Sequence, residues 1–75
     1  MPIIDMTATG KRIDSLRKAR GLSVKDLMIA VGVGSPQAIY KWLKGTSLPS
    51  VDNLVMLSDI FDLEIDEILV VTRAG

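Results

Sequence analysis

The chain has 75 residues, 48% of them apolar, with no cysteine, no histidine and a formal net charge of zero at pH 7. This length allows a single domain, residues 1–75, built around one core. The missing side chains exclude a disulfide scaffold, thiolate chemistry, a histidine base and the usual zinc sites. The sequence lacks both the roughly 20 apolar residues of a membrane span and the pattern of a signal peptide, so we expect a soluble, cytoplasmic protein.

The zero net charge hides an uneven distribution along the chain. Residues 1–49 contain eight Lys or Arg and three Asp or Glu, whereas residues 50–75 contain one and six. This segregation predicts a molecule with a basic face and an acidic end. The alternative is that charge has segregated by chance, as it does in many small helical domains.

Helix signals recur at short intervals, and no segment shows the alternation of a half-buried strand. The first predicted helix runs from about Thr7 to Arg20. Lys and Arg in its last turn and Gly21 after it are typical of a helix end. Residues 1–6 are predicted to form an N-terminal arm.

The second predicted helix begins after Ser23, which forms an approximate capping box with Asp26. Its apolar residues recur at i, i+3, i+4 and i+7, which predicts a core-facing stripe. They are Val24, Leu27, Met28 and Val31. The helix ends at Gly32 and Gly34, which supply positive φ where the chain turns sharply.

Three further helices complete the prediction. The third begins with Ser35 as N-cap and Pro36 at the first position, and it ends before Gly45. The fourth follows Ser50, and its inward residues are Leu54, Leu57 and Phe61. A short fifth helix covers about Ile65 to Val70 and belongs to a last segment, residues 65–75. Connections of two to six residues are typical of a compact all-α bundle.

The third helix is predicted to pack one face against the core and to expose polar side chains on another. Its predicted core stripe consists of Ile39, Trp42 and Leu43. Gln37, Lys41 and Lys44 fall at i, i+4 and i+7 on another face. A short helix, a glycine-containing turn and this helix have the layout of a helix-turn-helix over residues 23–45, whose second helix enters the DNA major groove. There Gln pairs with adenine and Lys with guanine, each worth about 1–3 kcal/mol of discrimination.

Other residues at the two ends of this helix suit phosphate oxygens, which position a protein without reading sequence. Lys44, Thr46 and Ser47 follow its last turn, and free backbone N–H groups are expected at its start. Tyr40 has two interpretations, since its hydroxyl could reach phosphate or its ring could cover the core edge. Trp42 is interpreted as core, which argues against a stacking platform for single-stranded nucleic acid. The alternative for the polar positions is an ordinary solvated helix face.

Three stretches, GKRIDSLRKARGLSVKDL, SPQAIYKWLKGTSLPS and VDNLVMLSDIFDLEIDEIL, carry a resemblance across roughly residues 10–70. They resemble the lambda repressor-like helix-turn-helix regulators of the Cro/CI or XRE type. The most specific element is W-x-x-G-x-x-x-P-S, from Trp42 to Ser50, followed by D-N-L at the start of the fourth helix. The resemblance implies a compact, all-α, five-helix domain that binds operator DNA, usually as a dimer, with the third helix as reader.

Together with the residue pattern, the resemblance predicts two sets of contacts with double-stranded DNA. Base contacts are predicted for Gln37, Lys41, Pro36 and Ala38. Phosphate contacts are predicted for Ser23, Lys25, Ser35, Tyr40, Lys44, Thr46 and Ser47.

The sequence departs from the family's usual pattern at several positions. Val24 replaces a phosphate-binding Gln, Met28 replaces a small residue, and the turn GVGSPQ is one residue longer than the commonest form. Leu43 replaces a Glu that often pairs with a helix-one arginine, here Arg17. Arg17 therefore needs another acceptor, because an unpaired buried charge costs several kcal/mol.

The acidic residues of the C-terminal third do not predict a metal or catalytic site. They are Asp59, Asp62, Glu64, Asp66 and Glu67. Their spacing lacks the glycine and the twelve-residue ligand order of a calcium loop. Acidic residues at a helix start complement its dipole, and no companion base is present for acid–base chemistry. We therefore expect no enzyme activity, no metal, no cofactor and no small-molecule substrate.

The apolar tail predicts either closure of the core by the fifth helix or a homodimer seam. The candidate seam residues are Ile65, Ile68, Leu69 and Val71. A twofold dimer would place two reading helices about 34 Å apart on the duplex.

The leading hypothesis is a sequence-specific, double-stranded DNA-binding transcriptional regulator. The alternative is a protein-interaction module on the same fold, such as an antitoxin-like or anti-regulator partner, because fold alone does not determine function. The zero net charge, the acidic C-terminal third and Val24 favour that alternative.

Overall fold

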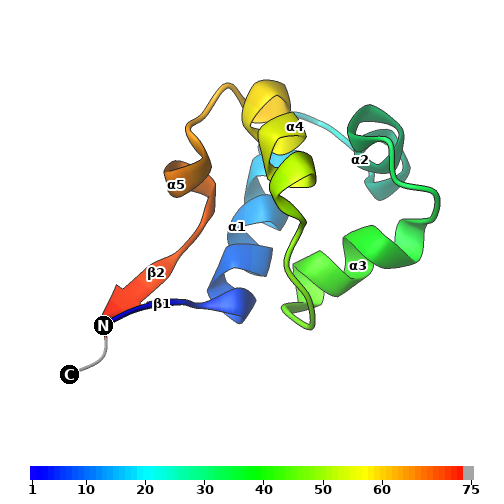
Figure 1. The fold of residues 1–75 in the computed structure, drawn as a ribbon. Helices are drawn as coiled ribbons and strands as arrows, with labels where there is room; N and C mark the ends of the chain where they lie inside the picture. The colour runs from blue at the N-terminus through cyan, green and yellow to red at the C-terminus, as the bar shows by residue number, and fades with distance from the viewer. Residues whose placement is uncertain (74–75) are drawn as a thin grey trace.

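The computed structural model describes residues 1–73, which form five helices and a two-stranded sheet that joins the chain ends (Figure 1). In chain order the elements are β1 (Pro2–Ile4), α1 (Met6–Ala19), α2 (Val24–Val31), α3 (Pro36–Lys44), α4 (Val51–Phe61), α5 (Ile65–Ile68) and β2 (Val71–Arg73). The five helices confirm the predicted all-α domain. The end of the predicted last segment, residues 74–75, lies outside the described residues.

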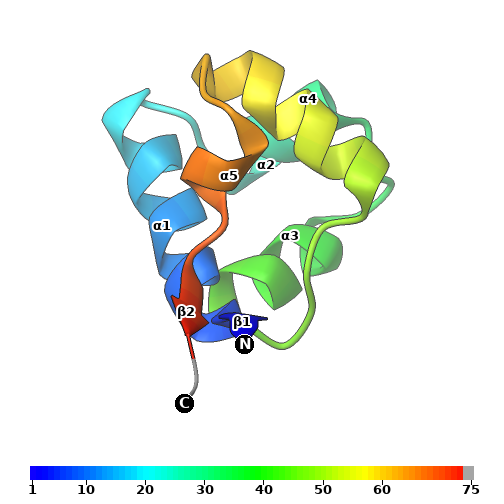
Figure 2. The same cartoon turned by 60° about the vertical axis from the view of Figure 1, so that its left-hand side comes forward.

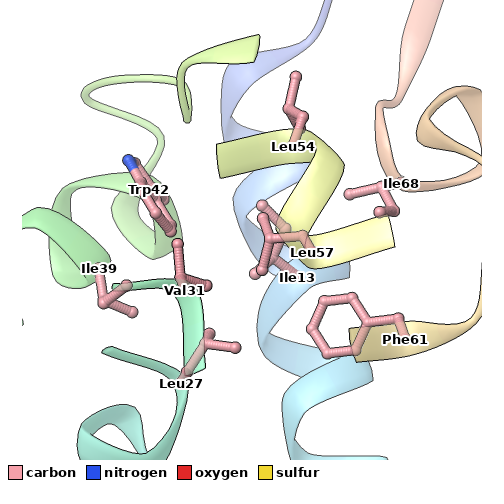
Figure 3. Close-up of a cluster of buried hydrophobic side chains, with 9 residues drawn as sticks. All are labelled: Ile13, Leu27, Val31, Ile39, Trp42, Leu54, Leu57, Phe61 and Ile68. Atoms are coloured by element: carbon pink, nitrogen blue, oxygen red, sulfur yellow. The ribbon is translucent and has the colours of Figure 1, made fainter. Parts of the chain in front are cut away.

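The core lies where the five helices meet (Figure 3). Its buried apolar side chains are Ile13, Leu27, Val31, Ile39, Trp42, Leu54, Leu57, Phe61 and Ile68. Each such side chain stabilises the fold by about 1.5–3 kcal/mol relative to exposure. The indole of Trp42 is only 5% exposed, which confirms that it is a core residue and excludes it as a stacking platform for bases.

The helix ends follow from local capping. The Asp5 carboxylate accepts a hydrogen bond from the Ala8 N–H at 2.9 Å, so α1 begins at Met6, one residue earlier than predicted. Gly32 has a φ of +87° at the end of α2, as predicted. The prediction of positive φ is wrong for Gly34, which is not among the left-handed residues of the described chain.

α1 and α3 cross with almost no space between their backbones. A Cβ added to Gly10 would lie 2.3 Å from the carbonyl oxygen of Trp42 and 2.7 Å from that of Leu43. At the end of α3, a Cβ on Gly45 would lie 2.6 Å from the Cα of Thr7. Only glycine permits this approach, so α3 is held across the first turns of α1.

A two-stranded antiparallel sheet at the chain ends corrects two sequence predictions. Residues 1–6 were predicted as an arm, but Pro2–Ile4 pairs with Val71–Arg73, with Ile3 opposite Thr72. The fully buried Thr9 hydroxyl accepts a hydrogen bond from the Val70 N–H at 2.9 Å. α5 ends at Ile68, two residues earlier than predicted, because Leu69 is extended and the Val70 N–H bonds to Thr9. Strands of three residues are too short for their alternation to be recognised.

The tail residues divide between core and surface. Ile68 is fully buried, so the prediction of a dimer-seam role is wrong for this residue, and closure of the core by α5 is confirmed. Ile65 and Leu69 are partly buried against the same core. Val71 is 47% exposed. Of the predicted seam, only Val71 is well exposed.

The crossing of α1 and α3 gives a first prediction. Gly10→Ala should lower the free energy of unfolding by about 2 kcal/mol, because overpacking against backbone outweighs the ~1 kcal/mol gain in helix propensity. Gly34→Ala is the matched control, since a Cβ there meets nothing within 4 Å. Chemical denaturation measures both variants, and equal changes in the two would contradict the tight crossing.

Candidate nucleic-acid interface

α3 presents two different faces along its nine residues. Ile39 and Trp42 point into the core, at 0% and 5% exposure (Figure 3). Gln37, Lys41 and Lys44 are exposed on another face, as their spacing predicted. In Figures 1 and 2, α3 lies at the edge of the bundle and runs across the ends of its neighbours. The exposed polar face is therefore accessible along the helix.

The start of α3 leaves backbone donors available. Ser35 is the N-cap residue in an extended conformation, and its partly buried side chain makes no capping hydrogen bond. Pro36 occupies the first position and has no N–H to lose. The N–H groups of the following residues, Gln37 and Ala38, have no partner within the helix. They form a place where an anionic oxygen could accept hydrogen bonds.

The end of α3 is built by hydrogen bonds to one carbonyl group. The Lys41 carbonyl accepts the Thr46 N–H at 3.0 Å and the Thr46 hydroxyl at 3.2 Å. Gly45 permits this turn with a φ of +77°. The Thr46 hydroxyl is thus engaged in closing the turn, while Ser47 is partly buried and Lys44 is exposed.

The start of α2 contains a complete capping box, which confirms the sequence prediction. Ser23 Oγ accepts the Asp26 N–H at 3.0 Å, and the Asp26 carboxylate accepts the Ser23 N–H at 3.0 Å. The backbone hydrogen bond from Ser23, followed by that of its side chain, lowers the pKa of Asp26. A carboxylate therefore lies beside Ser23 at the place where a phosphate contact is predicted. Lys25, two residues after Ser23, is exposed.

The remaining positions of the helix-turn-helix differ in their exposure to solvent. Tyr40 is 48% exposed, so its side chain is neither fully buried nor fully accessible to solvent. Ala38 is partly buried and Pro36 is exposed. Val24 packs against the core, which explains why this position does not offer a polar group.

The cations of the chain fall into two groups. Arg17 and Lys18 both pair with Asp14, at 2.6 Å and 3.3 Å. Arg12 donates to the Glu67 carbonyl and Arg20 to the Phe61 carbonyl, at the ends of α5 and α4. By contrast, the lysines of α3 form no ion pair within residues 1–73. Arg12, Arg17, Lys18 and Arg20 thus bond within the fold, and the α3 lysines remain available to an anionic ligand.

Lys11, which follows Gly10 at the crossing of α1 and α3, is a further candidate that the sequence reasoning did not single out. It lies on α1, one turn after Thr7, whose backbone contacts Gly45 at the end of α3. Its side chain is exposed. The sequence feature that could have indicated this position is the pair Gly10 and Gly45, which allows α1 and α3 to approach. Helical periodicity alone does not show that these two glycines meet.

The acidic residues of α4 and α5 form a separate surface. The carboxylates of Glu64 and Glu67 flank α5, where Glu67 accepts the Glu64 N–H at 3.0 Å. No group of three potential metal ligands occurs within the described residues. In the same part of the chain, no helix is long and apolar enough to cross a membrane.

Comparison with known proteins decides the family. A family model described as Helix-turn-helix (HTH_3) matches residues 13–68. The chain belongs to this helix-turn-helix family. It is similar in structure to the restriction-modification controller protein C.AhdI from Aeromonas hydrophila, with a TM-score of 0.76 and 28% sequence identity, covering 85% of this chain and 96% of that one. No curated protein matches the chain.

These matches confirm the lambda repressor-like, XRE-type helix-turn-helix fold and the DNA-binding class of the chain. In helix-turn-helix terms, α2 and α3 are the two helices of the motif, joined by residues 32–35. Residues 13–68 leave out β1 and β2, so the sheet of the chain ends lies outside the matched region.

Arg17 has the acceptors that the sequence analysis required. Besides Asp14, its guanidinium donates to the Leu22 carbonyl at 2.7 Å. Partial burial tends to raise the pKa of Asp14, but hydrogen bonds and charge from Arg17 and Lys18 lower it overall below its ordinary value of 3.8. Asp14 therefore stabilises the fold at pH above 3.8, and this contribution is lost as pH falls through the lowered pKa.

The Asp14 cluster gives a second prediction. Asp14→Asn should lower the free energy of unfolding at pH 7 by about 1 kcal/mol, and the difference from the parent chain should shrink below about pH 4. Asp59→Asn is the control, since Asp59 forms no ion pair among the described residues. Denaturation at pH 7 and pH 3 measures the effect. A difference that persists unchanged at pH 3 would show that the charge of Asp14 is not the cause.

Proposed function

We propose that the chain is a transcription regulator that binds double-stranded DNA in a sequence-specific way, with α3 in the major groove. The observation that carries this proposal is the exposed face of α3, where Lys41 and Lys44 have no carboxylate partner within residues 1–73. Its family membership and its likeness to a controller protein support the same class of function.

The polar face of α3 supplies two kinds of contact in this proposal. Gln37 and Lys41 reach base edges, with adenine and guanine as their preferred partners. Pro36 and Ala38 approach thymine methyl groups or the backbone at the start of the helix. These contacts provide the sequence preference.

A second set of groups positions the protein on the phosphates. Lys44 and the turn after α3 meet one strand, together with Ser47 and the Thr46 backbone. The N-terminal ends of α2 and α3 meet phosphates through their N–H groups, with Ser23, Lys25 and Ser35 close by. The Tyr40 hydroxyl is proposed as a further phosphate contact. Since these contacts release counterions, binding should weaken steeply with salt.

A protein-interaction module remains the second candidate function. It is favoured by the acidic residues of α4 and α5, which are exposed, and by the apolar Val24 at the start of α2. In that case the face of α3 would be covered by a protein partner. The two functions differ in one measurable respect, because only the DNA-binding function predicts salt-sensitive association of the chain with a DNA duplex.

The division of roles within α3 gives a third prediction. With an operator selected from random duplexes, Lys41→Ala should lose about 1–3 kcal/mol of discrimination at one base position. Lys44→Ala should instead weaken binding to all sequences alike and reduce the salt slope by about one. Competition binding against single-base variants measures both. Equal losses across all sequences for both variants would refute the assignment of Lys41 to bases.

A further inference from the structure

A buried threonine links the C-terminal segment to the start of α1. Thr9 is the only buried residue of the described chain with a polar side chain, and it is 0% exposed. Its hydroxyl accepts a hydrogen bond from the Val70 N–H at 2.9 Å. Valine has nearly the same shape but cannot accept this bond, and an N–H left without a partner inside a protein is costly. The position therefore requires a hydroxyl group because of Val70.

Val70 is attached to α1 through both of its backbone polar groups. Its N–H donates to Thr9, and its carbonyl accepts the Asp5 N–H at 2.8 Å. Asp5 is the N-cap of α1, and its carboxylate accepts the Ala8 N–H at 2.9 Å. The Asp5 carbonyl also accepts the Thr9 N–H at 2.9 Å. A single residue between α5 and β2 thus holds the residues on either side of the first turn of α1, residues 6–8.

The same turn of α1 supports the end of α3. Gly45 lies so close to it that an added Cβ would be 2.6 Å from the Cα of Thr7 and 2.8 Å from its nitrogen. Successive residues of a helix are rotated by about 100°, so Thr7 and Thr9 point in directions about 200° apart. Val70 and Gly45 therefore approach the first turn from nearly opposite sides. Figure 1 shows the start of α1 between the strands of the chain ends and the loop after α3.

We propose that Thr9 and Val70 are positioning residues for the turn after α3, residues 45–47. Their hydrogen bond fixes the first turn of α1, and this turn is the surface on which Gly45 rests. The role rests on the proposed function, in which Lys44 and Ser47 contact phosphate at this turn. Thr9 and Val70 both lie outside residues 13–68, which the family model matches.

The turn after α3 is bonded to α3 itself, so its place in the domain depends on α1. The Lys41 carbonyl accepts the Thr46 N–H at 3.0 Å and the Ser47 N–H at 3.3 Å, which fixes the turn relative to the helix. The place of this unit relative to the rest of the domain is set by its contact with α1. When the first turn of α1 loosens, the Lys44 ammonium and the Ser47 hydroxyl occupy a wider range of positions. Ordering them on phosphate then costs more conformational entropy, so affinity falls.

The test compares three variants of the full chain. Thr9→Val removes the acceptor of the Val70 N–H and keeps the shape of the side chain. Thr9→Ser keeps the hydroxyl and removes only a methyl group, so it should retain the positioning of the turn. Ser58→Ala is the matched control, because the Ser58 hydroxyl donates to the Leu63 carbonyl and thus forms a side chain–backbone bond between α4 and the loop before α5.

Amide hydrogen exchange measured by NMR separates positioning of the turn from overall stability. The Leu57 N–H lies in the buried part of α4 and reports global unfolding, whereas the Thr46 N–H reports local opening of the turn. Exchange at Leu57 should be faster in all three variants. Exchange at Thr46 should rise about fivefold in Thr9→Val alone, as expected for the loss of one hydrogen bond. An unchanged rate at Thr46 in Thr9→Val, or an equal rise in Ser58→Ala, would overturn the inference.

Binding to a labelled mixed-sequence duplex provides the second measurement. Thr9→Val should bind about fivefold more weakly and with a smaller salt slope, whereas Thr9→Ser should resemble the parent chain. Parental affinity and slope in Thr9→Val, despite faster exchange at Thr46, would overturn the role of Thr9 in DNA binding. If the parent chain binds no duplex at low salt, the proposed function fails, while selective exchange at Thr46 would still support positioning of the turn by Val70.

Discussion

The close contact between the α1 backbone at Gly10 and the carbonyl groups of α3 is the constraint on which the rest of the structure depends. A helix of nine residues is not stable alone in water. α3 is held because its carbonyls lie against a residue without a side chain, while Ile39 and Trp42 enter the core on the same side. Since packing uses one side of the helix, the opposite side is left for polar residues. The exposed polar face of α3, which we propose contacts DNA, is thus a consequence of how α3 is anchored.

The two kinds of cation in the chain serve different purposes. Arg12 and Arg20 donate to carbonyl groups of α5 and α4, and Arg17 joins Asp14 to the loop after α1. The planar guanidinium suits such multiple hydrogen bonds. The lysines of α3 have no equivalent partners in residues 1–73. The zero net charge is nevertheless misleading, because six of the nine carboxylates that balance the cations lie in residues 50–75, after α3.

Much of the fold could be predicted from the sequence, because its signals are local. Ser23 with Asp26, the Pro36 start of α3 and the spacing of Leu54, Leu57 and Phe61 each depend on neighbours within a few residues. The sheet of the chain ends could not be predicted, because it joins residues 2–4 to 71–73 through pairs that are distant in sequence.

The exposure of Lys41 and Gln37 followed from helical spacing. The position of Lys11 at the crossing of α1 and α3 and the hydrogen bond of the Thr46 hydroxyl could not be predicted in this way. The first depends on the tertiary crossing and the second on the geometry of the turn.

The most direct test of the central claim is the anisotropy of a labelled mixed-sequence duplex titrated with protein at two salt concentrations. We expect salt-sensitive binding that is lost in Lys41→Ala/Lys44→Ala and kept in Lys18→Ala/Arg73→Ala, which removes the same charge elsewhere. Absence of binding at low salt, or equal losses in both double variants, would contradict DNA binding by α3.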